Sequence, residues 1–132
     1  MSDLTGPPLT VLVADDDLDL VRLIARRLAN AGFDVITAAD GAEALELAQQ
    51  SLPHLALLDV MMPQLTGIEV MRKLAADPAT RTIAVILASA SLPQRPSSDD
   101  AFAGADDYIR KPFGPTEIPD RVRGVLLRTG AK

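Results

Sequence analysis

The chain has 132 residues, of which 48% are hydrophobic and 3% aromatic, so we expect one domain with an aliphatic core. Its formal net charge of −5 argues against non-specific binding to nucleic acid or to an anionic membrane. The absence of cysteine excludes disulfides, thiol catalysis and thiolate metal sites.

The first predicted unit is a strand followed by a helix. Residues 9–14 (LTVLVA) form a short apolar run rich in β-branched residues, which is typical of a buried strand. An amphipathic helix is predicted from Leu20, because Leu20, Ile24 and Leu28 are spaced four residues apart among arginines. Gly32 stands where such a helix is expected to end.

The second unit repeats this order. Residues 33–38 predict a strand, and Asp40 and Glu43 have the spacing of a capping box for a helix over residues 42–50. Residues 55–58 then predict a third strand, which runs directly into an aspartate. A second capping-box pattern, Thr-x-x-Glu, opens a helix predicted over residues 67–76.

The remaining elements complete an α/β pattern. Residues 83–88 (IAVILA) predict a fourth strand, residues 108–110 lie in a fifth, and a last helix fits the stretch after Pro115. Strands and helices that alternate with short links form a parallel sheet with helices on both faces. We therefore predict an α/β fold in one domain over residues 9–128, built on a doubly wound five-stranded parallel sheet.

Only short segments flank this domain. We expect a disordered tail over residues 1–8 and a C-terminal tail over residues 129–132. The opening MSDLTGPP has neither a basic start nor an apolar signal core, and no apolar run approaches the roughly 18 residues of a membrane span. A cytoplasmic location without a membrane segment is expected.

Polar residues stand at the carboxyl ends of the predicted strands, where open parallel sheets bind their ligands. They are Asp15 and Asp16 after the first strand, Asp59 after the third, Ser89 after the fourth and Lys111 after the fifth. Clustered carboxylates repel one another unless a cation such as Mg²⁺ neutralises them. A carboxylate can also be a nucleophile, and a lysine and a hydroxyl can bind phosphoryl oxygens. The edge of the sheet thus has the groups that phosphoryl transfer needs.

Four motifs carry a family resemblance: VLVADDD, LLDVMMPQLTG, VILASA and DDYIRKPF. The sequence separations are 43 residues from Asp16 to Asp59, 30 from Asp59 to Ser89 and 22 from Ser89 to Lys111. With these motifs and spacings, residues 9–128 resemble a receiver domain of the two-component response-regulator family. The resemblance implies the flavodoxin-like strand order 2-1-3-4-5.

The resemblance also implies a role for each site residue. Asp59 is the expected phosphoryl acceptor. Asp16 and Asp59 are expected to bind Mg²⁺ (or Mn²⁺) through carboxylate oxygens, with Asp15 acting mainly through a bound water and the backbone carbonyl of Met61 as a further ligand. Ser89 and Lys111 are expected to contact phosphoryl oxygens.

The same resemblance implies a switch and a set of partners. Tyr108 is expected to turn inward when Ser89 moves toward the phosphoryl group, and the peptide bond before Pro112 is expected to be cis. The phosphodonor is expected to be a histidine kinase or a histidine phosphotransfer protein, and the output is expected to be contact with a protein partner. Such a receiver catalyses only its own phosphorylation and dephosphorylation.

Other candidate residues have simpler interpretations. Asp17 is interpreted as a helix cap, His54 as a loop residue, and Met61 and Met62 as packing residues of a loop. A calcium loop beginning at Asp15 is excluded, because its glycine and terminal glutamate positions hold Leu20 and Arg26. No phosphate-binding P-loop sequence is present.

Two segments depart from the family pattern. Residues 91–100 (SLPQRPSSDD) fall where the fourth helix is expected, and two prolines there leave room for at most a short helix over residues 98–103. Pro119 and Gly124 are expected to weaken the final helix. We expect this face to be reshaped, so that the chain is a monomer or a weak dimer instead of a standard symmetric dimer.

Two rival functions are weighed against phosphorylation. One is an interaction module that keeps the fold but needs no phosphorylation, and the other is a small-molecule phosphatase that forms an aspartyl phosphate. The complete set of acids, hydroxyl and lysine argues against the first, and the lack of a recognisable general acid argues against the second. Because no DNA-binding segment follows residue 128, direct nucleic-acid binding by this chain is not expected; a stand-alone regulator and a domain of a longer protein both fit the sequence.

Overall fold

The computed structural model describes residues 7–90, 104–114 and 116–130. Within these residues five strands form one sheet in which all neighbours are parallel. They are β1 (Thr10–Ala14), β2 (Asp34–Ala38), β3 (Leu55–Asp59), β4 (Ala84–Ser89) and β5 (Asp107–Arg110). Their order across the sheet is β2-β1-β3-β4-β5, which confirms the predicted α/β fold and the strand order.

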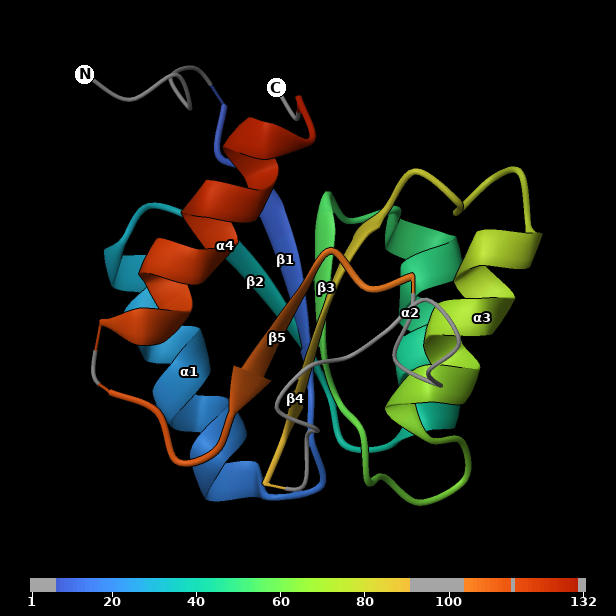
Figure 1. Cartoon of the computed structure of the whole chain (residues 1–132), viewed down its shortest axis with the longest axis horizontal. Helices are drawn as coiled ribbons and strands as arrows, with labels where there is room; N and C mark the ends of the chain where they lie inside the picture. Colours follow the sequence, from blue (N-terminus) through green and yellow to red (C-terminus); the bar gives the residue numbers. More distant parts are fainter. Residues whose placement is uncertain (1–6, 91–103, 115, 131–132) are drawn as a thin grey trace.

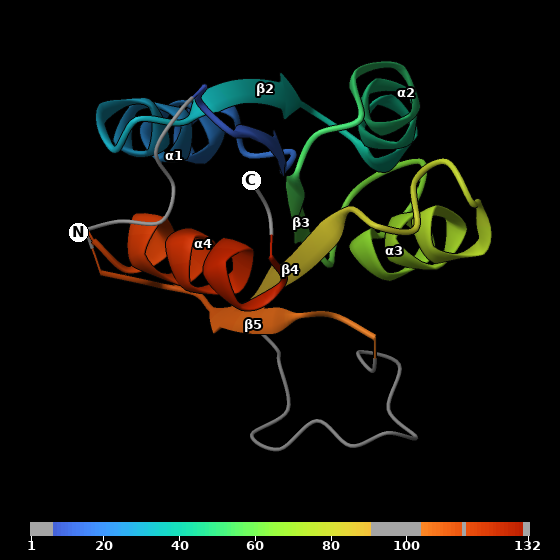
Figure 2. The same ribbon diagram turned by 90° about the horizontal axis from the view of Figure 1, so that it is seen from above.

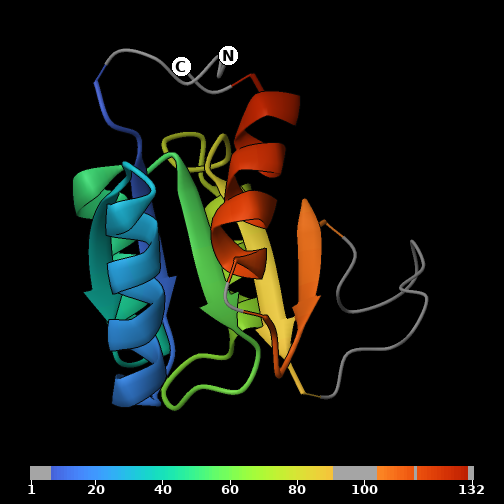
Figure 3. The same cartoon turned by 90° about the vertical axis from the view of Figure 1, so that its left-hand side faces the viewer.

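The described helices cover both faces of the sheet. They are α1 (Leu18–Asn30), α2 (Gly41–Ser51), α3 (Gly67–Ala76) and α4 (Glu117–Arg128). Figures 1 and 2 show α1 and α4 on one face and α2 and α3 on the other, and Figure 3 shows α1 and α4 side by side in front of the sheet. None of these helices is long and apolar enough to cross a membrane.

Polar side chains fix the starts of α1 and α3. Asp17 accepts a hydrogen bond from the backbone N–H of Leu20 at 3.2 Å, which confirms it as a helix cap. With Asp17 as the cap, α1 begins at Leu18, two residues before the predicted start. Thr66 and Glu69 form the predicted capping box, with each side chain accepting from the other residue's N–H at 3.1 and 2.9 Å.

The cap of α2 differs from the prediction in one bond. Asp40 accepts from the N–H of Glu43 at 2.8 Å, as expected. The Glu43 carboxylate, however, accepts from the N–H of Ala39 at 2.7 Å instead of from Asp40. The Glu43 side chain thus binds the backbone one residue before the cap, and the predicted box is only half formed.

Two aliphatic clusters pack on opposite faces of the sheet. Along β1 the side chains alternate: Val11 and Val13 pack with residues of α1 and α4, whereas Leu12 and Ala14 pack with residues of α2 and α3. All four are at most 2% exposed. Burying a side chain of the size of Val or Leu contributes about 1.5–3 kcal/mol, so the two clusters supply most of the driving force for folding.

The final helix is regular, in contrast to the weakening expected from its proline. α4 continues without a break from Glu117 to Arg128. Pro119 is its third residue, where a backbone N–H has no partner inside a helix, so the proline removes no helical hydrogen bond. The buried face of α4 carries Ile118, Val122, Val125 and Leu126.

Several expectations lie outside the described residues. These are the short helix over residues 98–103, the prolines in the segment 91–100, and the ends of the chain at residues 1–6 and 131–132. The domain limits and the expected lack of a symmetric dimer stay predictions.

Gly124 offers a test of the regularity of α4. An added Cβ at this exposed position would meet nothing within 4 Å. Because alanine is a better helix former, Gly124→Ala should raise the free energy of unfolding by about 0.5–1 kcal/mol in urea denaturation. As a control, Gly32→Ala should lower it, because Gly32 has a φ of 99°. A Gly124→Ala variant less stable than wild type would contradict a regular α4.

Candidate functional site

Three carboxylates meet at the carboxyl edge of the sheet, the lower edge in Figure 1. Asp15 and Asp16 follow β1, and Asp59 ends the neighbouring strand β3. Each offers one carboxylate oxygen, and these oxygens lie within 4.8 Å of one another. Asp15 and Asp59 are buried, whereas Asp16 is exposed. Hard oxygen ligands at this spacing can hold a divalent cation that keeps part of its water shell.

Lys111 brings a positive charge into this cluster. It directly follows β5, and the Lys111–Pro112 peptide bond is cis, as predicted. The Lys111 ammonium donates a hydrogen bond to Asp15 Oδ2 at 2.7 Å and lies 3.2 Å from Asp59 Oδ1. One ammonium cannot balance three carboxylates, so the cluster keeps a net negative charge.

The surrounding charges and burial shift the pKa values of Asp59 and Lys111. Burial raises the pKa of the Asp59 carboxyl, the nearby Asp15 raises it further, and Lys111 offsets only part of the increase. Burial disfavours the Lys111 ammonium, but its hydrogen bond to Asp15 and the charge of Asp59 outweigh burial and raise the pKa of Lys111. Lys111 is therefore charged at neutral pH, while the Asp59 carboxylate is held in an unfavourable environment that a cation relieves.

Two further expected site residues, Ser89 and Met61, belong to the end of β4 and to the loop after β3. Ser89 ends β4, is 4% exposed, and accepts a hydrogen bond at its backbone carbonyl from the N–H of Lys111 at 3.1 Å. Met61 lies two residues after Asp59, and its side chain is 69% exposed, so the expectation that it packs in the loop is wrong. Met62 is buried, as expected. The ligand role of the Met61 carbonyl stays a prediction.

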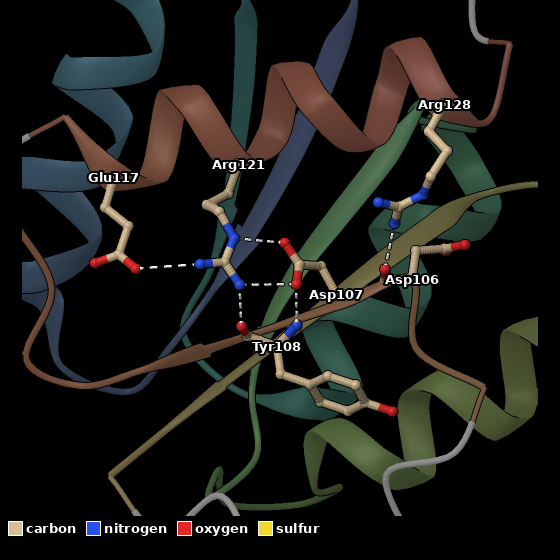
Figure 4. Close-up of polar contacts among 6 residues, drawn as sticks. All are labelled: Asp106, Asp107, Tyr108, Glu117, Arg121 and Arg128. Carbon is tan, nitrogen blue, oxygen red and sulfur yellow. Dashed lines mark hydrogen bonds and ion pairs between the residues drawn. The ribbon is translucent and has the colours of Figure 1, made fainter. Parts of the chain in front are cut away.

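Tyr108 is held at its backbone by α4 (Figure 4). The Arg121 guanidinium donates to both oxygens of the Asp107 carboxylate, at 2.6 and 2.8 Å, and to the Tyr108 carbonyl at 2.6 Å. Glu117 accepts a further bond from Arg121 at 3.3 Å. In Figure 4 the phenol ring of Tyr108 points away from Arg121, and it packs with the cluster under α2 and α3. β5 is thus fixed to α4 only three residues before Lys111.

The sequence patterns predict neither the contacts of Arg121 with β5 nor the hydrogen bond of His54 with Thr10. Asp107 and Arg121 are 14 residues apart on different elements, so no helical or strand periodicity connects them. His54 precedes β3, and its Nδ1 accepts from the N–H of Thr10 at 3.0 Å, which gives this loop residue a structural role in joining β1 to β3.

An apolar hollow lies beside the lysine. It has a volume of about 330 Å³ and is lined by Leu20, Leu23, Ala90, Lys111, Pro112 and Phe113. Leu23 is 41% exposed, and Leu18 at the start of the same helix is 54% exposed.

Comparison with known proteins identifies relatives across the described domain. The chain matches the model of the response regulator receiver domain family over residues 11–123. The response regulator MprA of Mycobacterium sp. (strain KMS) is 42% identical over 122 residues, which cover 92% of this chain and 52% of that protein. The alkaline phosphatase synthesis transcriptional regulatory protein PhoP of Bacillus subtilis (strain 168) is 40% identical over 126 residues, covering 90% of this chain and 49% of that protein. The chain therefore spans about half the length of these curated relatives.

Solved structures show the same fold. The chemotaxis response regulator CheY4 of Vibrio cholerae superposes with a TM-score of 0.82 at 28% identity, covering 90% of this chain and 99% of that chain. The BeF₃-activated DrrB receiver domain superposes with a TM-score of 0.77 at 30% identity, covering 92% of this chain and 99% of that chain.

The raised pKa of Asp59 predicts how stability depends on pH. Because the folded state binds the Asp59 proton more tightly than the unfolded state, the ionised carboxylate destabilises the metal-free fold as pH rises above the ordinary aspartate pKa of 3.8. Asp59→Asn removes this ionisation. In Mg²⁺-free urea denaturation the variant should therefore be more stable than wild type at neutral pH, with the difference shrinking in acid.

Asp107→Asn is the matched control with the opposite sign. Burial alone favours a higher pKa for Asp107, but the hydrogen bonds from Arg121 and from the Tyr108 N–H outweigh burial and lower it. Ionised Asp107 therefore stabilises the fold above its unfolded pKa, and Asp107→Asn should be less stable than wild type at neutral pH. Equal stability of wild type and Asp59→Asn at all pH values would contradict the electrostatic description of the site.

Proposed function

Because this chain belongs to the response regulator receiver domain family of two-component systems, we propose that it accepts a phosphoryl group on Asp59 from a phosphohistidine of a sensor kinase or phosphotransfer protein. The observation that carries the proposal is the convergence of Asp15, Asp16, Asp59 and Lys111 at one edge of the sheet. This group combines a nucleophile, cation ligands and a fixed positive charge.

The transfer is a displacement at phosphorus. An Asp59 carboxylate oxygen attacks the phosphorus of the phosphohistidine, and the phosphorus–nitrogen bond breaks with its electron pair moving to the imidazole nitrogen. That nitrogen gains a proton, and the donor leaves as neutral imidazole. Asp16 and Asp59, Asp15 through a water, and the Met61 carbonyl would hold Mg²⁺ (or Mn²⁺), and the bound ion would supply positive charge for the phosphoryl oxygens.

Lys111 and Ser89 receive the product. The Lys111 ammonium is 3.2 Å from Asp59 Oδ1, so a short movement lets it pair with an oxygen of a phosphoryl group on that carboxylate. The Ser89 hydroxyl, at the end of the adjacent strand β4, donates to another phosphoryl oxygen. Tyr108 then turns inward as Ser89 moves, which changes the face presented to a protein partner.

A protein is the expected phosphodonor because of the surface beside Lys111. The apolar hollow lined by Leu23, Pro112 and Phe113 adjoins the lysine, so a protein that covers it also delivers its phosphohistidine to the acceptor. The named relatives are transcriptional and response regulators, and we extend a regulatory output to this chain. Because this chain carries a net charge of −5, we do not expect it to bind nucleic acid directly.

Phosphorylation of Asp59 can be measured directly. Wild-type protein incubated with Mg²⁺ and a small phosphodonor should gain one phosphoryl group, detected by intact-mass spectrometry and mapped to Asp59. Asp59→Asn should gain none, whereas Asp107→Asn, which keeps the acceptor, should be modified. If wild type is not modified and binds no beryllofluoride, the chain is instead an interaction module that works without phosphorylation.

Metal binding is tested at the exposed carboxylate. Losing an outer partner of a metal site typically weakens metal binding about 10- to 100-fold, so Asp16→Ala, which removes a direct ligand, should weaken Mg²⁺ binding at least about tenfold. The fold should stay intact because Asp16 is exposed. Asp17→Ala is the matched control: it should lower stability by about 1 kcal/mol through the lost helix cap and leave Mg²⁺ affinity unchanged. Unchanged Mg²⁺ affinity in Asp16→Ala would remove Asp16 from the site.

A further inference from the structure

The first residue of α2, Gly41, lies against the loop that joins β3 to α3. Its backbone N–H donates a hydrogen bond to the Pro63 carbonyl at 3.2 Å. A Cβ added to Gly41 would lie 1.9 Å from the carbonyl oxygen of Leu65 and 2.6 Å from its carbonyl carbon. Atoms do not approach so closely without a bond, so the backbones of α2 and the loop meet with no room for a side chain.

Space, and not backbone conformation, requires glycine at this position. Gly41 has no positive φ and belongs to a regular helix, where alanine is the better helix former. Gly124 in α4 shows the opposite situation, because a Cβ there would meet nothing within 4 Å. The contact with the loop is therefore the physical reason for glycine at the start of α2.

The loop that Gly41 contacts begins directly after Asp59 and is closely packed at both of its ends. At its far end Gly67 donates its N–H to the Val60 carbonyl at 3.0 Å. A Cβ on Gly67 would lie 2.3 Å from the carbonyl oxygen of Asp59 itself. The loop is thus confined between two glycines, one against its middle and one against the backbone of the acceptor residue. The backbone that Gly41 contacts at Leu65 therefore belongs to a segment that starts at Asp59 and is bonded back to Val60 by Gly67.

We propose that Gly41 is a positioning residue of the metal and phosphoryl site, acting through the loop of residues 60–66. Without a side chain at Gly41, α2 lies directly against this loop, which carries the expected ligand Met61 and follows Asp59 in the chain. Mg²⁺ demands near-ideal octahedral geometry, so it is sensitive to small displacements of its ligands. Gly41 has this role only if the proposed function holds, because the site it positions is the one proposed there.

The experiment compares alanine in two helices of the same protein. Gly41→Ala should weaken Mg²⁺ binding about tenfold or more in calorimetric titration, the loss typical of residues that orient metal ligands. In metal-free protein it should also shift the NMR signals of the backbone amides of Asp59 and Met61. Gly124→Ala, the matched control, should change neither measurement. A purely structural role predicts lower stability of Gly41→Ala with Mg²⁺ affinity unchanged, and that result would overturn the proposal.

A second pair of variants covers the case in which Gly41→Ala does not fold. Gln64 has a φ of 73°, which glycine adopts more easily, so Gln64→Gly lets the loop yield to the added methyl group. Gly41→Ala/Gln64→Gly should then fold and bind Mg²⁺ more weakly than Gln64→Gly alone. Equal affinities in these two proteins would overturn the role of Gly41. If wild type and Gly124→Ala themselves bind no Mg²⁺, the proposed function fails instead.

Discussion

Mutual repulsion among three carboxylates is the constraint on which the rest of this structure depends. The ligand oxygens of Asp15, Asp16 and Asp59 lie within 4.8 Å of one another, and Lys111 offsets only part of their charge. Electrostatics alone would push the ends of β1 and β3 apart. The strands stay together because both faces of the sheet are buried under aliphatic clusters whose stabilisation does not depend on the edge. The core therefore holds three carboxylates together although one lysine does not neutralise them. The remaining negative charge favours the binding of a cation.

Parallel topology explains how residues far apart in the sequence share this edge. Every strand of the sheet runs in the same direction, so every strand delivers the residue after its last apolar position to the same side. Lys111 reaches Asp15 across 96 residues of sequence by this route alone. The Arg121 contacts then join β5 to α4 close to that lysine, so the strand that carries Lys111 is bonded to the outer helix.

The same topology decides what could be predicted from the sequence. Apolar runs locate the strands to within a residue or two, and once the sheet is known to be parallel the residues that end them must be neighbours. The pairing of Lys111 with Asp15 needs side-chain positions, which no periodicity contains. The Arg121 contacts escape prediction for the same reason. Pro119 was misleading because the effect of a proline depends on its position in a helix. As the third residue of α4, it removes no hydrogen bond that the helix makes.

Three locally unfavourable residues lie around Asp59, and at the two glycines among them the reason is that two stretches of backbone lie very close together. Gly41 and Gly67 each begin a helix with a poor helix former, and Gln64 takes a left-handed conformation between them. Each departure lies on the loop that follows Asp59 or against it, and at the two glycines an added Cβ would collide with backbone atoms of that loop or of Asp59 itself. Gly124 breaks the same propensity rule with empty space around it. Poor propensity alone is therefore no sign of a site; what distinguishes Gly41 and Gly67 is the backbone that occupies the place of their missing side chains.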